Sequence, residues 1–383
     1  MFDYATLKLI WWGLVGALLI GFAITDGMDI GVGSLLPFIA RNDSERRITI
    51  NTVGPHWDGN QVWFVTAGGA LFAAWPMVYA AAFSGFYMAM LLVLFCLFLR
   101  PLGFDYRSKI DDPRWRNAWD WGLFVGGIVP ALIFGVAFGN LLQGVPFKLD
   151  DILRAHYQGV LLGALLPLLN PFALLAGLIS VGMLTTHGAV WLQLRAGDPV
   201  ASRARWIAAA LGPLVALAFA GAGYWLWGHI DGFRIVSAPP HDALPNPLAK
   251  QVVRAAGAWF DNYRAMPIAW AVPILGLAGM ALASLLSLAR APGLAFVASA
   301  LGLAGIIGSA GVSMFPFVMP SSLDPNSSLT LWDSCSSQFT LSVMLIAVLV
   351  LLPVVVAYTI WCYVHMWGRV TADDIAAQSH SAY

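Results

Sequence analysis

The chain has 383 residues, of which 59% are hydrophobic and 10% charged, and its mean hydropathy is +0.75. A soluble domain carries about 25% charged residues, so this composition excludes a protein that covers itself with a water-facing surface. Twenty basic and twenty acidic residues give a formal net charge of zero, and no Gly-rich phosphate loop follows a strand. Nucleic acid and nucleotides are therefore not expected partners. The composition predicts an all-α integral membrane protein.

Segments long enough to cross a membrane follow one another along the chain, since about 20 apolar residues span the hydrocarbon core. Nine such windows occur, at 8–38, 55–75, 77–99, 119–142, 171–194, 206–228, 266–289, 293–317 and 338–364. The fifth begins with Asn170 and Pro171, a helix-capping residue followed by a proline that suits the first helical position. The apolar piece at 159–169 is too short to cross, so we expect it at the interface or against other helices.

Basic residues are unevenly distributed between the two faces that nine spans define. Thirteen fall on one face, namely Arg41, Arg46, Arg47, Arg100, Arg107, Lys109, Arg114, Arg116, Arg195, Arg203, Arg205, Arg290 and Arg369. Seven fall on the other, four of them in the loop 229–264. Cytoplasmic loops carry the excess of Lys and Arg, which predicts a periplasmic N-terminus and a cytoplasmic C-terminus.

Two further features concern the organisation of the single membrane domain, 1–383. The periplasmic loop 229–264 contains NPLAKQVVRAAGAWF, whose start signal and apolar spacing predict a short amphipathic helix on the membrane surface. ALLxG opens at Ala17 and again at Ala173, at the same point of spans one and five. This echo suggests two four-helix units, 1–142 and 171–317, plus a ninth helix, although chance explains so short a repeat equally well.

Four carboxylates lie near the cytoplasmic ends of the spans. Asp26 and Asp29 share a helix face in TDGMDIGVG, Asp58 lies in the first turns of span two, and Asp105 ends span three. Ionisable groups below the headgroups usually face protein or water and often mark a proton or ion route. We therefore expect Asp58 and Asp105 to take up protons, with Asp26 and Asp29 as candidates for the same route.

Structural interpretations of these positions stay open. Asp58 would suit the positive end of a helix dipole, and Asp105 would suit a solvated loop beside Arg107. Gly27 and Gly31 form a GxxxG motif on the first span, which is typical of close helix packing.

The sequence does not predict a redox metal in this chain. Its seven histidines show no metal-ligand spacing on one helix face. Hydrogen-bonded histidines are favoured over a haem held between distant helices, which remains an alternative. The three cysteines, Cys96, Cys335 and Cys362, lack CxxC or CxxCH spacing, so neither a disulfide framework nor covalent haem attachment is expected.

Several motifs together resemble one known family. They are IGFAITDGMDIGVG, RNDSERRITINTVGPHWDGNQVWFVTAGGALFAAWPMVYAAAFSGFY, RPLGFDYRSK, WRNAWDWG, GVAFGNLLQGVPF and MFPFVMPSSLDPNSSLTLWDSCSSQ. The chain resembles subunit II of bacterial cytochrome bd quinol oxidase from end to end. The resemblance implies a nine-helix partner of a haem-bearing subunit I, which ligates two b haems and one haem d. That complex oxidises quinol at the outer side of the inner membrane and reduces dioxygen to water with cytoplasmic protons.

The resemblance also implies roles for two of the acids. In that family subunit II is implicated in proton uptake toward the oxygen site, and Asp58 in HWDGN and Asp105 in GFDYRSK match the acids concerned. Membrane lipid and small single-helix accessory subunits are further candidate partners. Two other functions remain open: a proton-coupled secondary transporter, which would also need buried acids near one face, and a purely structural assembly partner.

Overall fold

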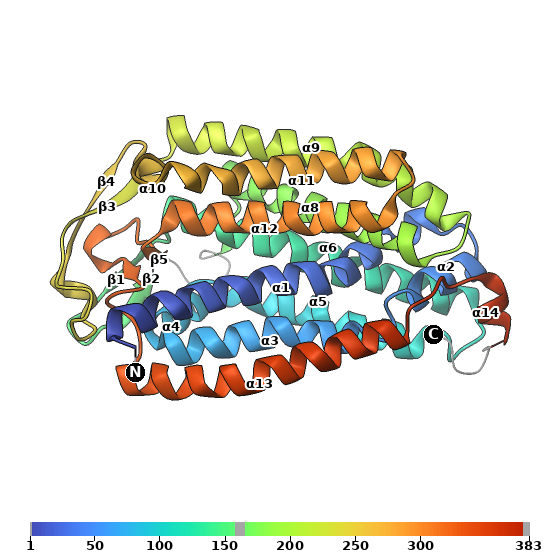
Figure 1. The fold of residues 1–383 in the computed structure, drawn as a ribbon, viewed down its shortest axis with the longest axis horizontal. Coiled ribbons are helices and arrows are strands. Elements are labelled where there is room, and N and C mark those ends of the chain that lie inside the picture. The colour runs from blue at the N-terminus through green and yellow to red at the C-terminus, as the bar shows by residue number, and fades with distance from the viewer. Residues whose placement is uncertain (1, 158–164, 378–383) are drawn as a thin grey trace.

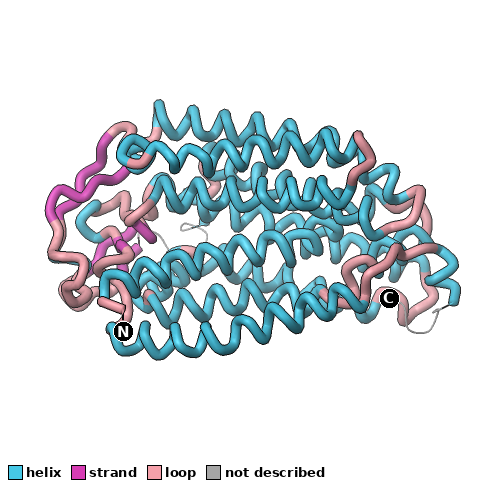
Figure 2. The backbone as a smooth tube through the Cα atoms, in the orientation of Figure 1, coloured by secondary structure: helices cyan, strands magenta, loops and turns pink. Residues whose placement is uncertain are grey.

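The computed structural model describes residues 2–157 and 165–377. Long helices run side by side along the long axis of the molecule (Figure 1). The strands gather at the end where α1 begins, and α2 and α14 lie at the opposite end, where α13 finishes (Figures 1 and 2). We call these the hairpin end and the α2 end. The basic connections that the sequence assigns to the cytoplasm lie at the α2 end, and that assignment stays a prediction.

The bundle is built from long helices joined by short elements. The helices are α1 (Tyr4–Ile39), α2 (Asp43–Asn51), α3 (Trp57–Ala74), α4 (Pro76–Gly85), α5 (Tyr87–Tyr106), α6 (Pro113–Gln143), α8 (Pro171–Arg195), α9 (Val200–His229), α10 (Asp261–Ala265), α11 (Ala271–Leu288), α12 (Pro292–Met314), α13 (Gln338–His365) and α14 (Ala372–Ala377). Among the described residues, three two-stranded antiparallel hairpins pair β1 (Phe147–Leu149) with β2 (Ala155–Tyr157), β3 (Gly232–Ser237) with β4 (Gln251–Ala255), and β5 (Phe317–Met319) with β6 (Leu329–Thr330).

Most of the predicted spans correspond to helices that can cross a membrane. Among the described residues eight have the length and apolar character: Tyr4–Ile39, Tyr87–Tyr106, Pro113–Gln143, Pro171–Arg195, Val200–His229, Pro267–Leu288, Pro292–Met314 and Gln338–His365. They match predicted spans one and three to nine, which confirms the all-α membrane fold. The second predicted span coincides with α3, whose 18 residues start with the polar run WDGNQ. The count of nine crossings therefore stays a prediction.

The third predicted span is divided in the structure. It begins as the short helix α4, and after a bend at Phe86 it continues as α5 to Tyr106. Tyr157 of β2 packs against Gly85 at this bend, and its hydroxyl donates to the carbonyl oxygen of Ala81. The β1–β2 hairpin therefore packs against the bend between α4 and α5.

The start of α8 agrees with its capping signal. Asn170 accepts a hydrogen bond from the backbone N–H of Ala173 at 2.9 Å, and Pro171 is the first helical residue. The predicted interfacial piece at 159–169 falls largely outside the described residues. Its last part is the 3-10 turn Leu166–Leu168, directly before α8.

The loop predicted to carry an amphipathic helix forms a β-hairpin instead. Arg234 lies opposite Val253 and Ile235 opposite Val252 in the antiparallel pair β3–β4. Val252 is buried and Val253 exposed, which is the alternation of a strand. The helix prediction was wrong because apolar residues in so short a stretch fit both periods, and β-branched valines favour the pleated strand.

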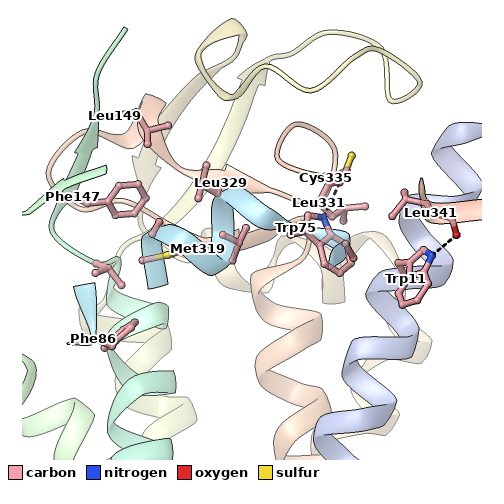
Figure 3. Packing of buried hydrophobic residues seen from close by; sticks show 14 of the residues in the cluster. Trp11, Trp75, Phe86, Phe147, Leu149, Met319, Leu329, Leu331, Cys335 and Leu341 are labelled. Carbon is pink, nitrogen blue, oxygen red and sulfur yellow. Dashed lines mark hydrogen bonds between the residues drawn. The ribbon is translucent and has the colours of Figure 1, made fainter. Parts of the chain in front are cut away.

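A cluster of buried side chains closes the hairpin end (Figure 3). Trp11 of α1 donates from its indole N–H to the backbone oxygen of Leu341 in α13, at 3.0 Å. Trp75, Phe147 and Met319 come from three different connections and pack in the same cluster. Buried tryptophans need a partner for the indole N–H, so this bond fixes the start of α13 to α1.

Close contact between α1 and α8 depends on glycine. A Cβ added to Gly188 would lie 2.6 Å from the backbone N of Val32 and 2.7 Å from the Cα of Gly31. A Cβ on Gly31 would collide with the carbonyl oxygen of Leu184. Small residues at such a crossing let two backbones touch, as the GxxxG motif suggested.

We predict that Gly188→Ala lowers the free energy of unfolding by about 1–3 kcal/mol, because the added methyl group must push two helix backbones apart. Thermal unfolding of the purified protein in detergent measures the change. The control is Gly16→Ala on the same helix as Gly31, since a Cβ there meets no atom within 4 Å. Equal stability of the two variants would contradict the close crossing.

Candidate functional site

A buried ion pair joins α1 and α5 inside the bundle. The guanidinium of Arg100 donates to both carboxylate oxygens of Asp26, with Nη1 2.8 Å from Oδ2. Neither side chain is more than 2% exposed. A charge removed from water requires a partner in good geometry, and the forked guanidinium–carboxylate contact provides it. Asp26 is therefore held as the ionised partner of Arg100.

Asp29 lies about one helical turn further along α1, and its contact with the Arg100 guanidinium is longer than that of Asp26. Nη2 of Arg100 is 4.0 Å from Asp29 Oδ2, which is beyond hydrogen-bond distance. Instead, Nδ2 of Asn60 on α3 donates to this oxygen at 2.8 Å. Asp29 Oδ1 is buried and has no hydrogen-bond partner among the described residues. Two acids thus face one guanidinium.

Asn60 connects Asp29 to two further elements. Its Oδ1 accepts a hydrogen bond of 2.7 Å from the hydroxyl of Tyr363 on α13. Its Nδ2 lies 3.2 Å from Nδ1 of His56, the residue before α3, so that nitrogen acts as an acceptor. These contacts join α1, α3, α5 and α13. We call the following residues the buried acid network: Asp26, Asp29, Asn60, Arg100 and Tyr363.

Asp58 stands two residues before Asn60 on α3 and points the other way. Two residues correspond to about 200° around a helix axis, so the two side chains lie on nearly opposite faces. Asn60 is buried, whereas Asp58 is exposed at the surface of the chain. Val62 and Val65 continue this outward face toward the hairpin end, and both are exposed. Asp58 therefore begins an otherwise apolar stripe on the outside of the bundle.

Asp105 lies near the end of α5 and is also exposed. Arg107, which the sequence suggested as its neighbour in a solvated loop, is buried and bonds to other acids. The structure therefore separates the four predicted acids into two pairs. Asp26 and Asp29 meet inside the bundle, and Asp58 and Asp105 lie on its outer surface toward the α2 end.

Asp120 of α6 is a buried acid that the sequence analysis did not select. It accepts hydrogen bonds from Nε of Arg107 at 2.6 Å and from Nη1 of Arg46 at 2.7 Å, which ties three elements together. The sequence offered one signal for it: Asp120 is the one acidic residue of the predicted span 119–142, and an acid in an apolar span usually has a buried partner. Nearby, Arg203 donates to Glu45 at 2.6 Å, and this bond holds the pKa of Glu45 below its usual value. Ion pairs thus close the α2 end.

Comparison with known proteins identifies the family of this chain. The family model described as cytochrome bd terminal oxidase subunit II matches residues 7–366. The chain belongs to this family. It is 57% identical over 383 residues to cytochrome bd-I ubiquinol oxidase subunit 2 of Escherichia coli strain K12, with all of both chains covered. It is 54% identical over 384 residues to a probable cytochrome oxidase subunit 2 of Haemophilus influenzae, again with both chains fully covered.

A solved structure shows the same fold. The chain resembles part of the bd oxidase from Geobacillus thermodenitrificans with a TM-score of 0.62 and 17% sequence identity, covering 95% of this chain and 100% of that one. At this identity the likeness concerns the fold alone. Together with the apolar helices, membership of the cytochrome bd subunit II family makes the chain a multi-pass protein of the bacterial inner membrane.

Because cytochrome bd oxidases are haem proteins, a fully buried histidine such as His187 is a candidate haem ligand. His187 lies within the bundle, but Nδ1 is 2.7 Å from Ser299 Oγ and Nε2 is 3.0 Å from the carbonyl oxygen of Ile24. An axial ligand needs a ring nitrogen free to reach iron. Across residues 2–157 and 165–377, no group of three His, Cys, Asp or Glu could hold a metal ion. His187 therefore does not fit haem ligation.

Proposed function

We propose that this chain is the haem-free subunit of a quinol oxidase that reduces dioxygen to water, and that it conducts cytoplasmic protons toward the oxygen site of its partner. Full-length relatives named as ubiquinol oxidase subunits support the oxidase. The observation that carries the proton route is the outward position of Asp58 at the start of α3.

An exposed acid within a membrane-facing stripe needs an explanation. A carboxylate facing lipid costs a few kcal/mol, so such groups face protein or water instead. Val62 and Val65 on the same face are exposed in the isolated chain as well. A partner subunit that covers this face would place Asp58 at the boundary between two proteins, where it can pass protons from one to the other.

Asp105 extends this route toward the cytoplasm. It is exposed near the end of α5, at the basic end of the bundle. Protons would reach Asp105 first and Asp58 next, and Asp26 and Asp29 are candidates for a branch inside the chain. Each acid accepts a proton on one carboxylate oxygen and releases it again without other chemistry, so the route requires only hydrogen-bond contact or water between stations.

The cofactors in this proposal belong to the partner. Two b haems and one haem d would be ligated by subunit I, where they would supply electron transfer from quinol and the reduction of dioxygen. Quinol oxidation would release protons on the periplasmic side while the oxygen site consumes cytoplasmic ones. Full-length similarity to oxidase subunits favours this function over a proton-coupled secondary transporter.

The experiment that tests the oxidase is a visible spectrum of the complex that co-purifies with a tagged copy of this chain. We predict that the dithionite-reduced minus oxidised spectrum shows bands of b-type haem and of a red-shifted chlorin, because the partner subunit carries both. The same spectrum of a mock purification from untagged membranes is the control. A folded preparation without haem and without a large partner would contradict the oxidase and favour the transporter.

A further inference from the structure

The charges of the buried acid network do not balance when every acid is ionised. The titratable groups beside Asp29 are Asp26 on its own helix and Arg100 on α5. Tyr363 of α13 and His56 before α3 bond to Asn60, and Arg195 of α8 acts on those two groups from further away. Arg100 carries the one positive charge among them that directly approaches the acids, and both of its forked contacts go to Asp26. Ionised Asp29 would leave the network with one excess negative charge.

Burial raises the free-energy cost of that excess negative charge. The side chain of Asp29 has 0% exposure, so water does not screen it from the carboxylate of Asp26. Two carboxylates that share a site cannot both ionise at low cost, and the one with the poorer partners keeps its proton. A buried oxygen without a hydrogen bond costs more when it is charged than when it is neutral, and Asp29 Oδ1 is such an oxygen.

A proton on Asp29 removes the excess charge and preserves the observed contacts, and an unpaired neutral hydroxyl at Oδ1 costs less than an unpaired charged oxygen. The proton would sit on Oδ1, because Oδ2 already accepts from Asn60 at 2.8 Å. A carboxylic acid's carbonyl oxygen accepts this bond as a carboxylate oxygen does. The network of Asp26, Arg100 and Asp29 is then neutral overall.

We propose that Asp29 holds a proton in the resting protein, and that Asn60 links this proton-holding acid to Tyr363 of α13 and His56 at the start of α3. Asn60 is two residues from Asp58, so the first turns of α3 carry an exposed acid on one face and a contact to the protonated acid on the other. Participation of this proton in turnover rests on the proposed function. The protonation itself does not.

Isotope-edited infrared spectroscopy of the purified complex tests the proposal. Aspartate labelled with carbon-13 at the side-chain carboxyl shifts the carbonyl band of a protonated Asp and separates it from other bands. We expect such a band at neutral pH in the unmodified complex and its loss in Asp29→Asn. Asp58→Asn and Asp111→Asn, which change exposed acids, should keep it.

A second variant decides the question even where Asp29→Asn fails to assemble. In Asp26→Asn the guanidinium of Arg100 has Asp29 as its sole nearby acid, so Asp29 should ionise and the band should disappear although Asp29 is still present. A purely structural acid would not respond in this way. Persistence of the band in Asp29→Asn or in Asp26→Asn, or its absence from the unmodified complex, would overturn the proposal. Unchanged turnover of Asp58→Asn would refute the relay without affecting this result.

Discussion

Replacing Asp58 by asparagine is expected to lower the steady-state quinol oxidase turnover of the assembled complex by about 100-fold, the lower range for loss of a positioned acid–base group. Asparagine keeps the size and one acceptor oxygen of the side chain, but its amide cannot take up and release a proton. The deficit should grow between about pH 6 and pH 9, because protons must then come from water in which they become scarcer. Oxygen consumption with a soluble quinol measures the effect.

The matched control for Asp58→Asn is Asp111→Asn. Asp111 belongs to the same end of the bundle, its side chain is 93% exposed, and it pairs with Arg116 at 2.9 Å. Exposed pairs of this kind contribute little, so turnover and assembly should not change. Asp58→Glu should recover part of the activity, since the carboxyl is retained and displaced by one methylene.

The same measurement separates the relay from a structural role. An acid that merely stabilises the start of α3 would reduce the amount of assembled complex but not the turnover of each assembled complex. The haem content of each preparation measures the amount of assembled complex, and the oxygen-consumption rate is divided by it. Normal turnover of Asp58→Asn at every pH in this range, with full haem content, is incompatible with the relay.

The positions of most membrane-spanning helices were predictable from the sequence, but the orientation of polar side chains was not. Apolar length locates a span because lipid accepts any apolar surface. The same property hides which face of a helix packs on protein, since lipid-facing and protein-facing stripes are equally apolar. Asp58 and Asn60 illustrate this: both are polar residues in the first turns of α3, and the structure alone shows that Asn60 faces the protein interior and Asp58 the outside.

Arg100 shows a second limit of sequence reasoning. At the end of an apolar run it was counted with the cytoplasmic loop cations, yet it lies inside the bundle and binds Asp26, 74 residues earlier in the chain. Neither residue by itself indicates a partner at that separation. Asp120 was missed for the same reason, because its partners Arg46 and Arg107 belong to other elements.

Arg100→Met is expected to lower the free energy of unfolding by about 3–5 kcal/mol, since removing one member of a buried ion pair leaves an uncompensated charge. Methionine preserves much of the aliphatic volume, so packing changes little. Thermal unfolding of the purified complex in detergent measures the loss. The control is Arg114→Met at the start of α6, where the arginine is exposed and its replacement should have little effect.

Restoring the charge balance tests the explanation for that loss. In the double variant Asp26→Asn with Arg100→Met, the pair is removed as a unit and Asp29 remains as a neutral acid, so part of the stability should return. A double variant less stable than Arg100→Met alone would mean that Asp26 contributes through contacts other than its charge, and the assignment of Asp26 as the ionised acid would fail.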